Sequence, residues 1–195
     1  MQDSDNELVQ RYLAGEEDAF YSLVSKYKNP ITNFITRIIG NYDQAVDLTQ
    51  ETFLRVYKSL GSYRSDYQFS TWIYRIASNL AIDELRWRKR RGLFGRQNAS
   101  REEPEKETAP EEQLADTRRS ADEVLADMQY RKLIQEAIQT LPPAYRTVFV
   151  LNAVEEMDYE KIGQVLGCSL GTVKSRLHRA KSLLQKKLAP YWKKI

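Results

Sequence analysis

The stretch YEKIGQVLGCSLGTVKSRLHRAK, residues 159–181, predicts two helices joined by a sharp turn. Asp158 can cap the first helix through its carboxylate. Gly167 tolerates a positive φ and therefore supplies the turn, and Ser169 is the expected N-cap of the second helix. This pattern is typical of a helix-turn-helix, whose second helix enters the major groove of DNA.

The second of these helices has an apolar stripe and a polar face without acidic residues. Val173, Leu177, Ala180 and Leu184 recur at i, i+4, i+7 and i+11, which is the spacing of residues that face a core. The other side carries basic and small polar residues near the helix N-terminus, where recognition helices meet base edges and phosphates. We therefore predict contacts with duplex DNA from Thr172, Lys174, Ser175, Arg176, His178 and Arg179.

Outward from this motif, helical periodicity covers most of the chain, and no stretch alternates with the period of a strand. Capping or turn residues mark the starts and ends of the expected helices, with Pro30 in the first turn of a helix of its own. These residues are Asp18, Pro30, Gly40, Asp43 and Ser70. The segment LPPAYR, residues 141–146, predicts the end of one helix and the start of the next. The fold class is therefore all-α.

A change in composition divides the chain. Residues 92–120 are rich in charge, glycine and proline and poor in apolar side chains, which is typical of a flexible linker. We predict two small helical domains, residues 1–95 and 123–195, joined by an acidic flexible linker over residues 96–122. Two basic blocks flank this linker: residues 86–96 carry six basic residues and no acidic ones, and residues 168–195 carry no Asp or Glu. The net charge of +3 says little alone, but this distribution indicates two surfaces that face polyanions.

Several classes of protein are disfavoured. The single cysteine, Cys168, excludes a disulfide framework and favours a reducing compartment. The N-terminus is polar and acidic, unlike a signal peptide, and no apolar run approaches the ~20 residues that span a bilayer. His178 is the only histidine, and no His, Cys and carboxylate residues have metal-ligand spacing. We predict a soluble cytoplasmic protein with no membrane insertion, metal, cofactor or catalytic residue; a nuclease is a remote alternative.

Four segments resemble, in the right order, the conserved regions of extracytoplasmic-function (group IV) sigma factors of the sigma-70 superfamily. DLTQETFLRVY (47–57) resembles region 2.2, and FSTWIYRIASNLAIDELRWRKR (69–90) resembles regions 2.3 and 2.4. EKIGQVLGCSLGTVKSRLHRAK (160–181) resembles region 4, and LPPAYRTVFVLNAVEEMDYEKIG (141–163) resembles the segment that leads into it. The resemblance implies a sigma factor that directs RNA polymerase core enzyme to specific promoters and is not itself an enzyme.

The resemblance also implies residue roles. In the family, region 2.2 docks on the clamp helices of the largest polymerase subunit, and the matching helical face here carries Asp47, Gln50, Glu51, Leu54 and Arg55. The minus-ten element is read as a single strand with a flipped base, which calls for aromatic surface and polar groups. The matching candidates are Tyr63, Tyr67, Ser78, Asn79, Asp83, Arg86 and Arg88. Residues 123–195 are then expected to read the minus-thirty-five element as duplex, whereas Phe69 and Trp72 are expected to lie in the core.

Two alternatives from other classes stay open at this point. A freestanding helix-turn-helix regulator would bind duplex DNA without polymerase, and it would dimerise. A helical adaptor that binds only protein would leave the acid-free recognition helix unexplained. The resemblance also implies an anti-sigma factor as a partner, because many members of the family are held inactive by one.

Overall fold

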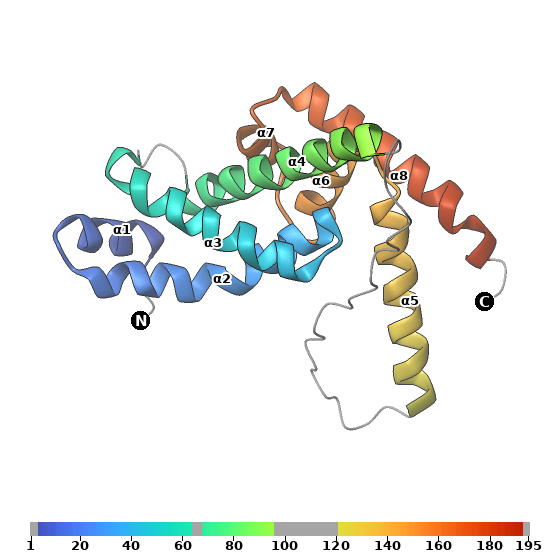
Figure 1. Ribbon diagram of the computed structural model, residues 1–195, viewed down its shortest axis with the longest axis horizontal. Coiled ribbons are helices and arrows are strands. Elements are labelled where there is room, and N and C mark those ends of the chain that lie inside the picture. The colour runs from blue at the N-terminus through green and yellow to red at the C-terminus, as the bar shows by residue number, and fades with distance from the viewer. Residues whose placement is uncertain (1–3, 64–67, 96–120, 193–195) are drawn as a thin grey trace.

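The computed structural model describes residues 4–63, 68–95 and 121–192, and every regular element within these ranges is helical. In chain order the elements are α1 (Asp5–Leu13), α2 (Glu17–Ile39), α3 (Tyr42–Ser59), the 3-10 turn η1 (Leu60–Ser62), α4 (Phe69–Gly95), α5 (Ala121–Gln139), α6 (Pro143–Ala153), α7 (Tyr159–Leu166) and α8 (Leu170–Trp192). Figure 1 shows α5 projecting away from the other helices. The all-α prediction is confirmed. None of the described helices is both long and apolar enough to cross a membrane.

Helix α2 runs without a break through Pro30, so the predicted start of a separate helix at this residue is wrong. A proline inside a helix removes one backbone hydrogen bond and costs about 3 kcal/mol. On either side of Pro30, Tyr27, Ile31 and Phe34 are buried in the core. Burying each such side chain contributes about 1.5–3 kcal/mol, so together they outweigh the proline. Tertiary packing therefore keeps one long helix where local sequence favours two.

The N-terminal half is built on α2, against which α1, α3 and α4 pack. Gly40 ends α2 in the left-handed conformation at φ 75°, as predicted. The side chain of Asn41 then accepts a hydrogen bond from the backbone N–H of Gln44 at 2.8 Å and so caps α3. This tight turn lays α3 beside α2 and leaves one face of α3 and one face of α4 directed outward.

The C-terminal half contains the predicted helix-turn-helix. Asp158 accepts a hydrogen bond from the backbone N–H of Lys161 at 2.7 Å and caps α7. Gly167 ends α7 with φ 60°, and Ser169 Oγ accepts from the backbone N–H of Thr172 at 3.3 Å at the start of α8. The predicted apolar stripe is buried throughout: Val173, Leu177, Ala180 and Leu184. The capping, turn and core predictions for this motif are confirmed.

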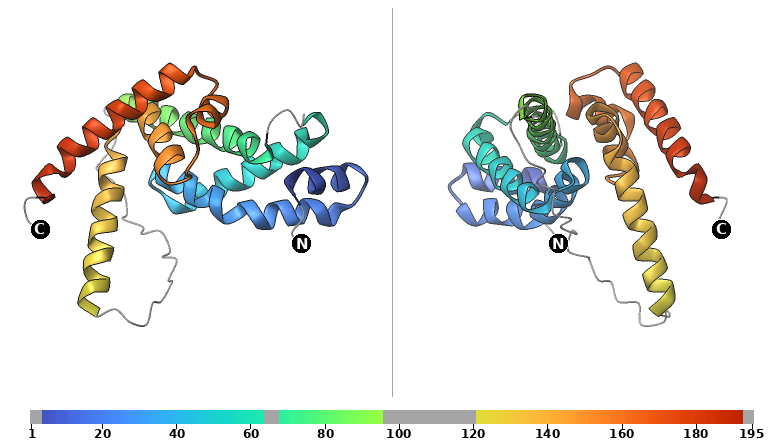
Figure 2. Two further views of the ribbon diagram at one scale, coloured as in Figure 1. Left: turned by 180° about the vertical axis from the view of Figure 1, so that it is seen from behind. Right: turned by 45° about the vertical axis from the view of Figure 1, so that its right-hand side comes forward.

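The two halves pack against each other through one continuous cluster of buried side chains. Helix α7 lies on α4, and α5 and α6 contact α2 (Figure 2). At the carboxyl end of α2, Arg146 donates to the carbonyl oxygen of Ile38, and Gln139 Nε2 donates to that of Arg37 at 2.7 Å. The boundaries of the two domains stay a prediction, and residues 96–120 of the predicted linker lie outside the described residues.

A second polar contact between the halves joins α4 to the segment after α6. The Tyr74 hydroxyl donates a hydrogen bond to the carboxylate of Glu155. Burial raises the pKa of Glu155, while this hydrogen bond and the nearby Arg37 act in the opposite direction. Burial also raises the pKa of Tyr74, so its hydroxyl keeps its proton. The contact therefore places a partly desolvated carboxylate between the halves.

Candidate nucleic-acid interface

The recognition helix α8 presents a basic outer face. Lys174, Ser175, His178 and Arg179 are exposed, whereas Thr172 and Arg176 are half-buried. The Ser175 hydroxyl donates to the carbonyl oxygen of Thr172 at 3.0 Å, so it lies close to the helix. The helix N-terminus and the four exposed side chains form one surface that can meet a groove edge and the adjoining phosphates.

One member of this surface is held by a residue that sequence reasoning missed. Arg179 Nη1 donates to the Tyr145 hydroxyl at 3.1 Å, across 34 residues of sequence. Tyr145 belongs to α6, and only the packing of α6 against α8 brings the two together. Because this hydrogen bond already restrains the guanidinium in the free protein, the group would lose less freedom on binding an anion.

Gly163 of α7 leaves little room for a side chain. A Cβ atom there would lie 3.0 Å from the backbone oxygen of Cys168, which is tighter than nearly all real Cβ contacts. The close approach brings α7 onto the residues just before α8. The glycine therefore sets how near the two helices of the motif can come, and with it the direction in which α8 leaves the turn.

Helix α4 carries the predicted single-strand face. Asn79, Asp83 and Arg86 are exposed, and Arg86 Nη1 lies 3.2 Å from Asp83 Oδ1. Arg75 is exposed four residues before Asn79, on the same side of the helix, and it was not among the residues predicted from the sequence. The sequence feature that could have identified Arg75 is its i, i+4, i+8 spacing with Asn79 and Asp83. The face therefore combines cationic, amide and carboxylate groups.

Two predicted strand-binding residues of α4 do not lie on this outward face. Ser78 is fully buried. Arg88 reaches back to α2: its Nε lies 2.8 Å from Glu84 Oε1, and its Nη1 donates to the carbonyl oxygen of Ile39 at 3.1 Å. Helical rotation explains both, because each residue along a helix turns the side chain by about 100°. Ser78 is one position from Asn79, and Arg88 is two positions past Arg86, so both point away from the outward face. In this arrangement neither side chain is free to meet DNA.

Replacing Ser78 by alanine should therefore stabilise the protein without weakening strand binding. In the part of the chain that the structure describes, the Ser78 hydroxyl has no hydrogen-bond partner, and a buried unsatisfied hydroxyl costs about 1–3 kcal/mol. We expect the free energy of unfolding of Ser78→Ala to rise by about 1 kcal/mol in urea titrations. The matched variant Asn79→Ala should leave stability unchanged. A loss of stability in Ser78→Ala would contradict the burial argument.

Tyr63 begins the loop before α4 and lies within an aromatic cluster. Its ring centroid is 5.1 Å from that of Trp72 and 5.9 Å from that of Phe69. Phe69 is buried in the core, as expected, whereas Trp72 is half-buried and packs against the core from outside. Burial and the nearby Asp5 carboxylate raise the pKa of Tyr63, so its hydroxyl stays protonated. Tyr67 lies outside the described residues. The described part of the predicted pocket is thus one half-buried tyrosine on an aromatic base.

The predicted polymerase-docking face of α3 borders a groove. Asp47, Gln50, Leu54 and Arg55 are exposed and Glu51 is half-buried, with Arg55 Nε 2.8 Å from Glu51 Oε1. Gln50 and Leu54 line an open groove of about 810 Å³ between α1, α2 and α3. Its lining includes an aromatic cluster of Tyr12, Phe20 and Tyr57. The groove combines this aromatic lining with the charged side chains of Glu17 and Lys28, which suits a protein helix.

No group of three or more His, Cys, Asp or Glu side chains that could hold a metal lies within the described residues. The exposed candidate residues of α8, α4 and α3 thus lie on the outward-facing sides of three different helices.

Comparisons with known proteins agree in both halves. The family model described as Sigma-70 region 2 matches residues 23–91, and that described as Sigma-70, region 4 matches residues 131–184. The chain is 36% identical over 180 residues to the ECF RNA polymerase sigma factor SigW of Bacillus subtilis (strain 168), covering 92% of this chain and 94% of that protein. It is 35% identical over 189 residues to the RNA polymerase sigma-H factor of Pseudomonas aeruginosa, with coverages of 97% and 96%.

Solved structures share the fold. The sigma factor RpoE of Bartonella quintana, determined with the anti-sigma factor NepR, superimposes with a TM-score of 0.67 at 21% identity, covering 87% of this chain and 96% of that one. CnrH, determined with the cytosolic domain of CnrY, also gives a TM-score of 0.67, at 23% identity and coverages of 96% and 99%. At these identities the likeness concerns the arrangement of helices.

Proposed function

Since the chain belongs to the extracytoplasmic-function sigma factors of the sigma-70 family, we propose that its three outward faces divide promoter recognition between them. Residues 1–95 bind core RNA polymerase through α3 and hold the unwound minus-ten strand on α4. Residues 123–195 read the minus-thirty-five duplex through α8. Residues 96–122 connect the two. The family membership also removes the alternative of a freestanding regulator, because the region 2 match covers residues 23–91.

The observation that carries this proposal is the outer face of α8. A capped helix with Lys174, Ser175, His178 and Arg179 exposed and no acidic residue after its start is suited to a polyanion and to little else. The chain acts by recruitment: it brings the polymerase to the promoter, and the polymerase performs the chemistry. A cytoplasmic location follows, since both binding partners are found there.

Control by an anti-sigma factor is the second part of the proposal. Each of the two structural neighbours above was determined with a partner protein, and for RpoE that partner is the anti-sigma factor NepR. In this chain the aromatic groove beside α3 provides apolar surface that such a protein would cover. Competition between the partner and core polymerase for this groove would keep the sigma factor inactive.

Run-off transcription with purified core RNA polymerase and a promoter library tests the proposal. We expect selective transcripts that depend on this chain. Lys174→Ala should weaken binding to the minus-thirty-five duplex about tenfold and reduce its salt dependence, as expected when one cationic contact is lost. Lys186→Ala, an exposed lysine further along α8, is the matched control and should change little. Tight binding to duplex DNA without polymerase, and no transcripts with it, would overturn the proposal.

A further inference from the structure

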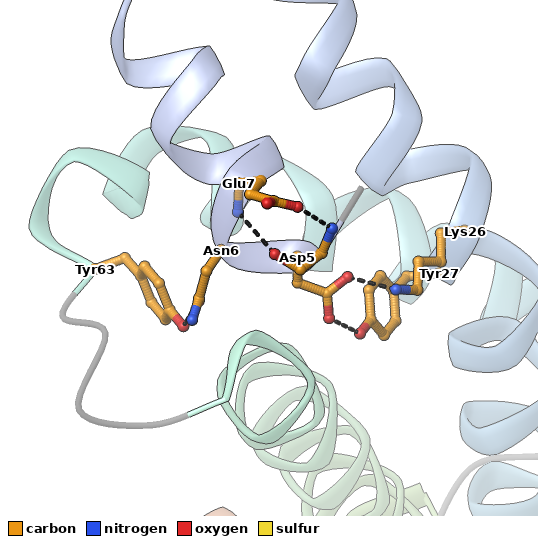
Figure 3. Close-up of polar contacts among 7 residues, drawn as sticks. Asp5, Asn6, Glu7, Lys26, Tyr27 and Tyr63 are labelled. Atoms are coloured by element: carbon orange, nitrogen blue, oxygen red, sulfur yellow. Dashed lines mark hydrogen bonds and ion pairs between the residues drawn. The ribbon is translucent and has the colours of Figure 1, made fainter. Parts of the chain in front are cut away.

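The first turn of α1 is held firmly against α2. Ser4 and Glu7 form a capping box, with Ser4 N donating to Glu7 Oε2 at 2.6 Å and Glu7 N donating to Ser4 Oγ at 3.3 Å. Asp5 accepts hydrogen bonds from Lys26 Nζ at 2.6 Å and from the Tyr27 hydroxyl at 2.5 Å (Figure 3). Charge-assisted hydrogen bonds of this length are the strong ones. The turn therefore provides a fixed point on the N-terminal half.

The neighbouring residue of this turn reaches the candidate strand-binding pocket. The Tyr63 hydroxyl donates a hydrogen bond to Asn6 Oδ1 at 3.2 Å, across 57 residues of sequence. Figure 3 shows the two side chains pointing toward each other. Tyr63 packs its ring on Trp72 and Phe69. The ring thus contacts aromatic neighbours along its side and Asn6 at its hydroxyl end, which restricts its rotation before any base arrives.

The hydrogen bond between Tyr63 and Asn6 lies at the surface, outside the packed core. Asn6 is exposed, and Leu8 and Val9 make the buried contacts of α1. Asp5, whose side chain is 19% exposed, already ties the turn to α2. An exposed neutral hydrogen bond contributes little to global stability. Core packing therefore does not explain why Asn6 lies at the hydroxyl end of the Tyr63 ring.

We propose that Asn6 is a positioning residue for single-strand recognition, which orients Tyr63 so that an unstacked base of the minus-ten strand can stack on it. The inference rests on the proposed function. Stacking a base on an aromatic ring contributes about 1–3 kcal/mol, and a ring already fixed in the required plane loses less freedom on binding. The amide of Asn6 also carries N–H donors at the edge of the ring, where they can meet acceptor groups of the stacked base.

The test measures binding of the reconstituted holoenzyme to a fluorescent single-stranded oligonucleotide. The oligonucleotide is the non-template minus-ten strand of a promoter that the transcription library yields. We expect Asn6→Ala to weaken strand binding about fivefold while binding to minus-thirty-five duplex and the thermal unfolding midpoint stay unchanged. Asn6→Asp keeps an acceptor for the Tyr63 hydroxyl and should restore at least half of the lost affinity. Gln10→Ala, one turn along α1, is the matched control.

A double-mutant cycle shows whether Asn6 acts through Tyr63. Tyr63→Phe keeps the ring and removes the hydroxyl, so it should match Asn6→Ala, and the double variant should bind no more weakly than either single one. Additive losses, unchanged strand binding in Asn6→Ala, or an equal loss on duplex would each overturn the inference. If the wild-type holoenzyme binds no single strand, the proposed function fails as well. If the wild-type holoenzyme binds the strand and the Asn6 variants bind it equally well, only the inference about Asn6 fails.

Discussion

Replacing Arg146 by methionine is expected to detach α6 from the carboxyl end of α2 and to lower the free energy of unfolding by about 3 kcal/mol. The guanidinium is buried and donates to four oxygen atoms. They are the carbonyl oxygens of Ile38, Gln139 and Leu141 and the side-chain Oε1 of Gln139. Methionine fills a similar volume but leaves these acceptors without their donor, and each buried acceptor left unsatisfied carries a cost.

Carbonyl oxygens stabilise the positive charge of Arg146. No carboxylate is among its hydrogen-bond partners in the described part of the chain. Burial, and then repulsion from Arg88, lower its pKa to about 10. Even so, the group stays protonated at neutral pH. The carbonyl oxygens at the end of α2 carry the negative end of the helix dipole, which stabilises a cation there. Arg146 therefore links the two halves through the end of a helix.

Urea titration tests the expected loss of stability, and small-angle scattering tests the expected change in the radius of gyration. The Arg146→Met variant should unfold at lower urea and show a larger radius of gyration, because the C-terminal helices lose their main polar tie to α2. Arg146→Lys should recover only part of the loss, since one ammonium group cannot reproduce the planar fork of donors. Arg131→Met, an exposed arginine on α5, is the control. Unfolding of Arg146→Met at the wild-type urea concentration would refute the assignment.

Features set by a few neighbouring residues were predictable from the sequence. The two caps act over three residues: Asp158 and Ser169 each accept a hydrogen bond from the backbone N–H three positions later. Gly167 adopts the positive φ that the turn requires. The buried stripe of α8 followed from its spacing. Capping and helical spacing depend on residues close together in the chain, so the sequence alone predicts them.

Features that depend on distant parts of the chain were missed. Pro30 continues a helix because core packing on both sides outweighs its local effect. Ser78 and Arg88 belong to the right helix, but their side chains turn inward, because one position in a helix rotates a side chain by a quarter turn or more. Arg146 bonds to Ile38 across 108 residues of sequence, a contact that no local pattern predicts. The all-α class and the helix-turn-helix were therefore predictable, whereas the continuity of α2 and the inward or outward direction of single polar residues needed the structure.

Replacing Leu54 by glutamate is expected to lower the affinity for core RNA polymerase by about a hundredfold, the size of a strong interface hot spot. Leu54 is 53% exposed and lines the groove, as do Tyr12, Phe20 and Tyr57. Together with the apolar groove it forms a contiguous patch of the kind that protein interfaces cover. Glutamate would place an unpaired charge in that interface. Its desolvation would cost more than the lost contact alone, so Leu54→Ala should show a smaller loss of about tenfold.

The comparison with Leu13 separates docking from general hydrophobicity. Leu13 is 47% exposed on α1 and does not line the groove, so Leu13→Glu changes charge and exposed apolar surface in the same way. Competition for core polymerase against a labelled wild-type chain would give each affinity, with thermal unfolding as the folding control. Because both side chains are exposed, both variants should fold. If Leu13→Glu weakened binding as much as Leu54→Glu, the groove would not be the docking surface, since of the two only Leu54 lines it.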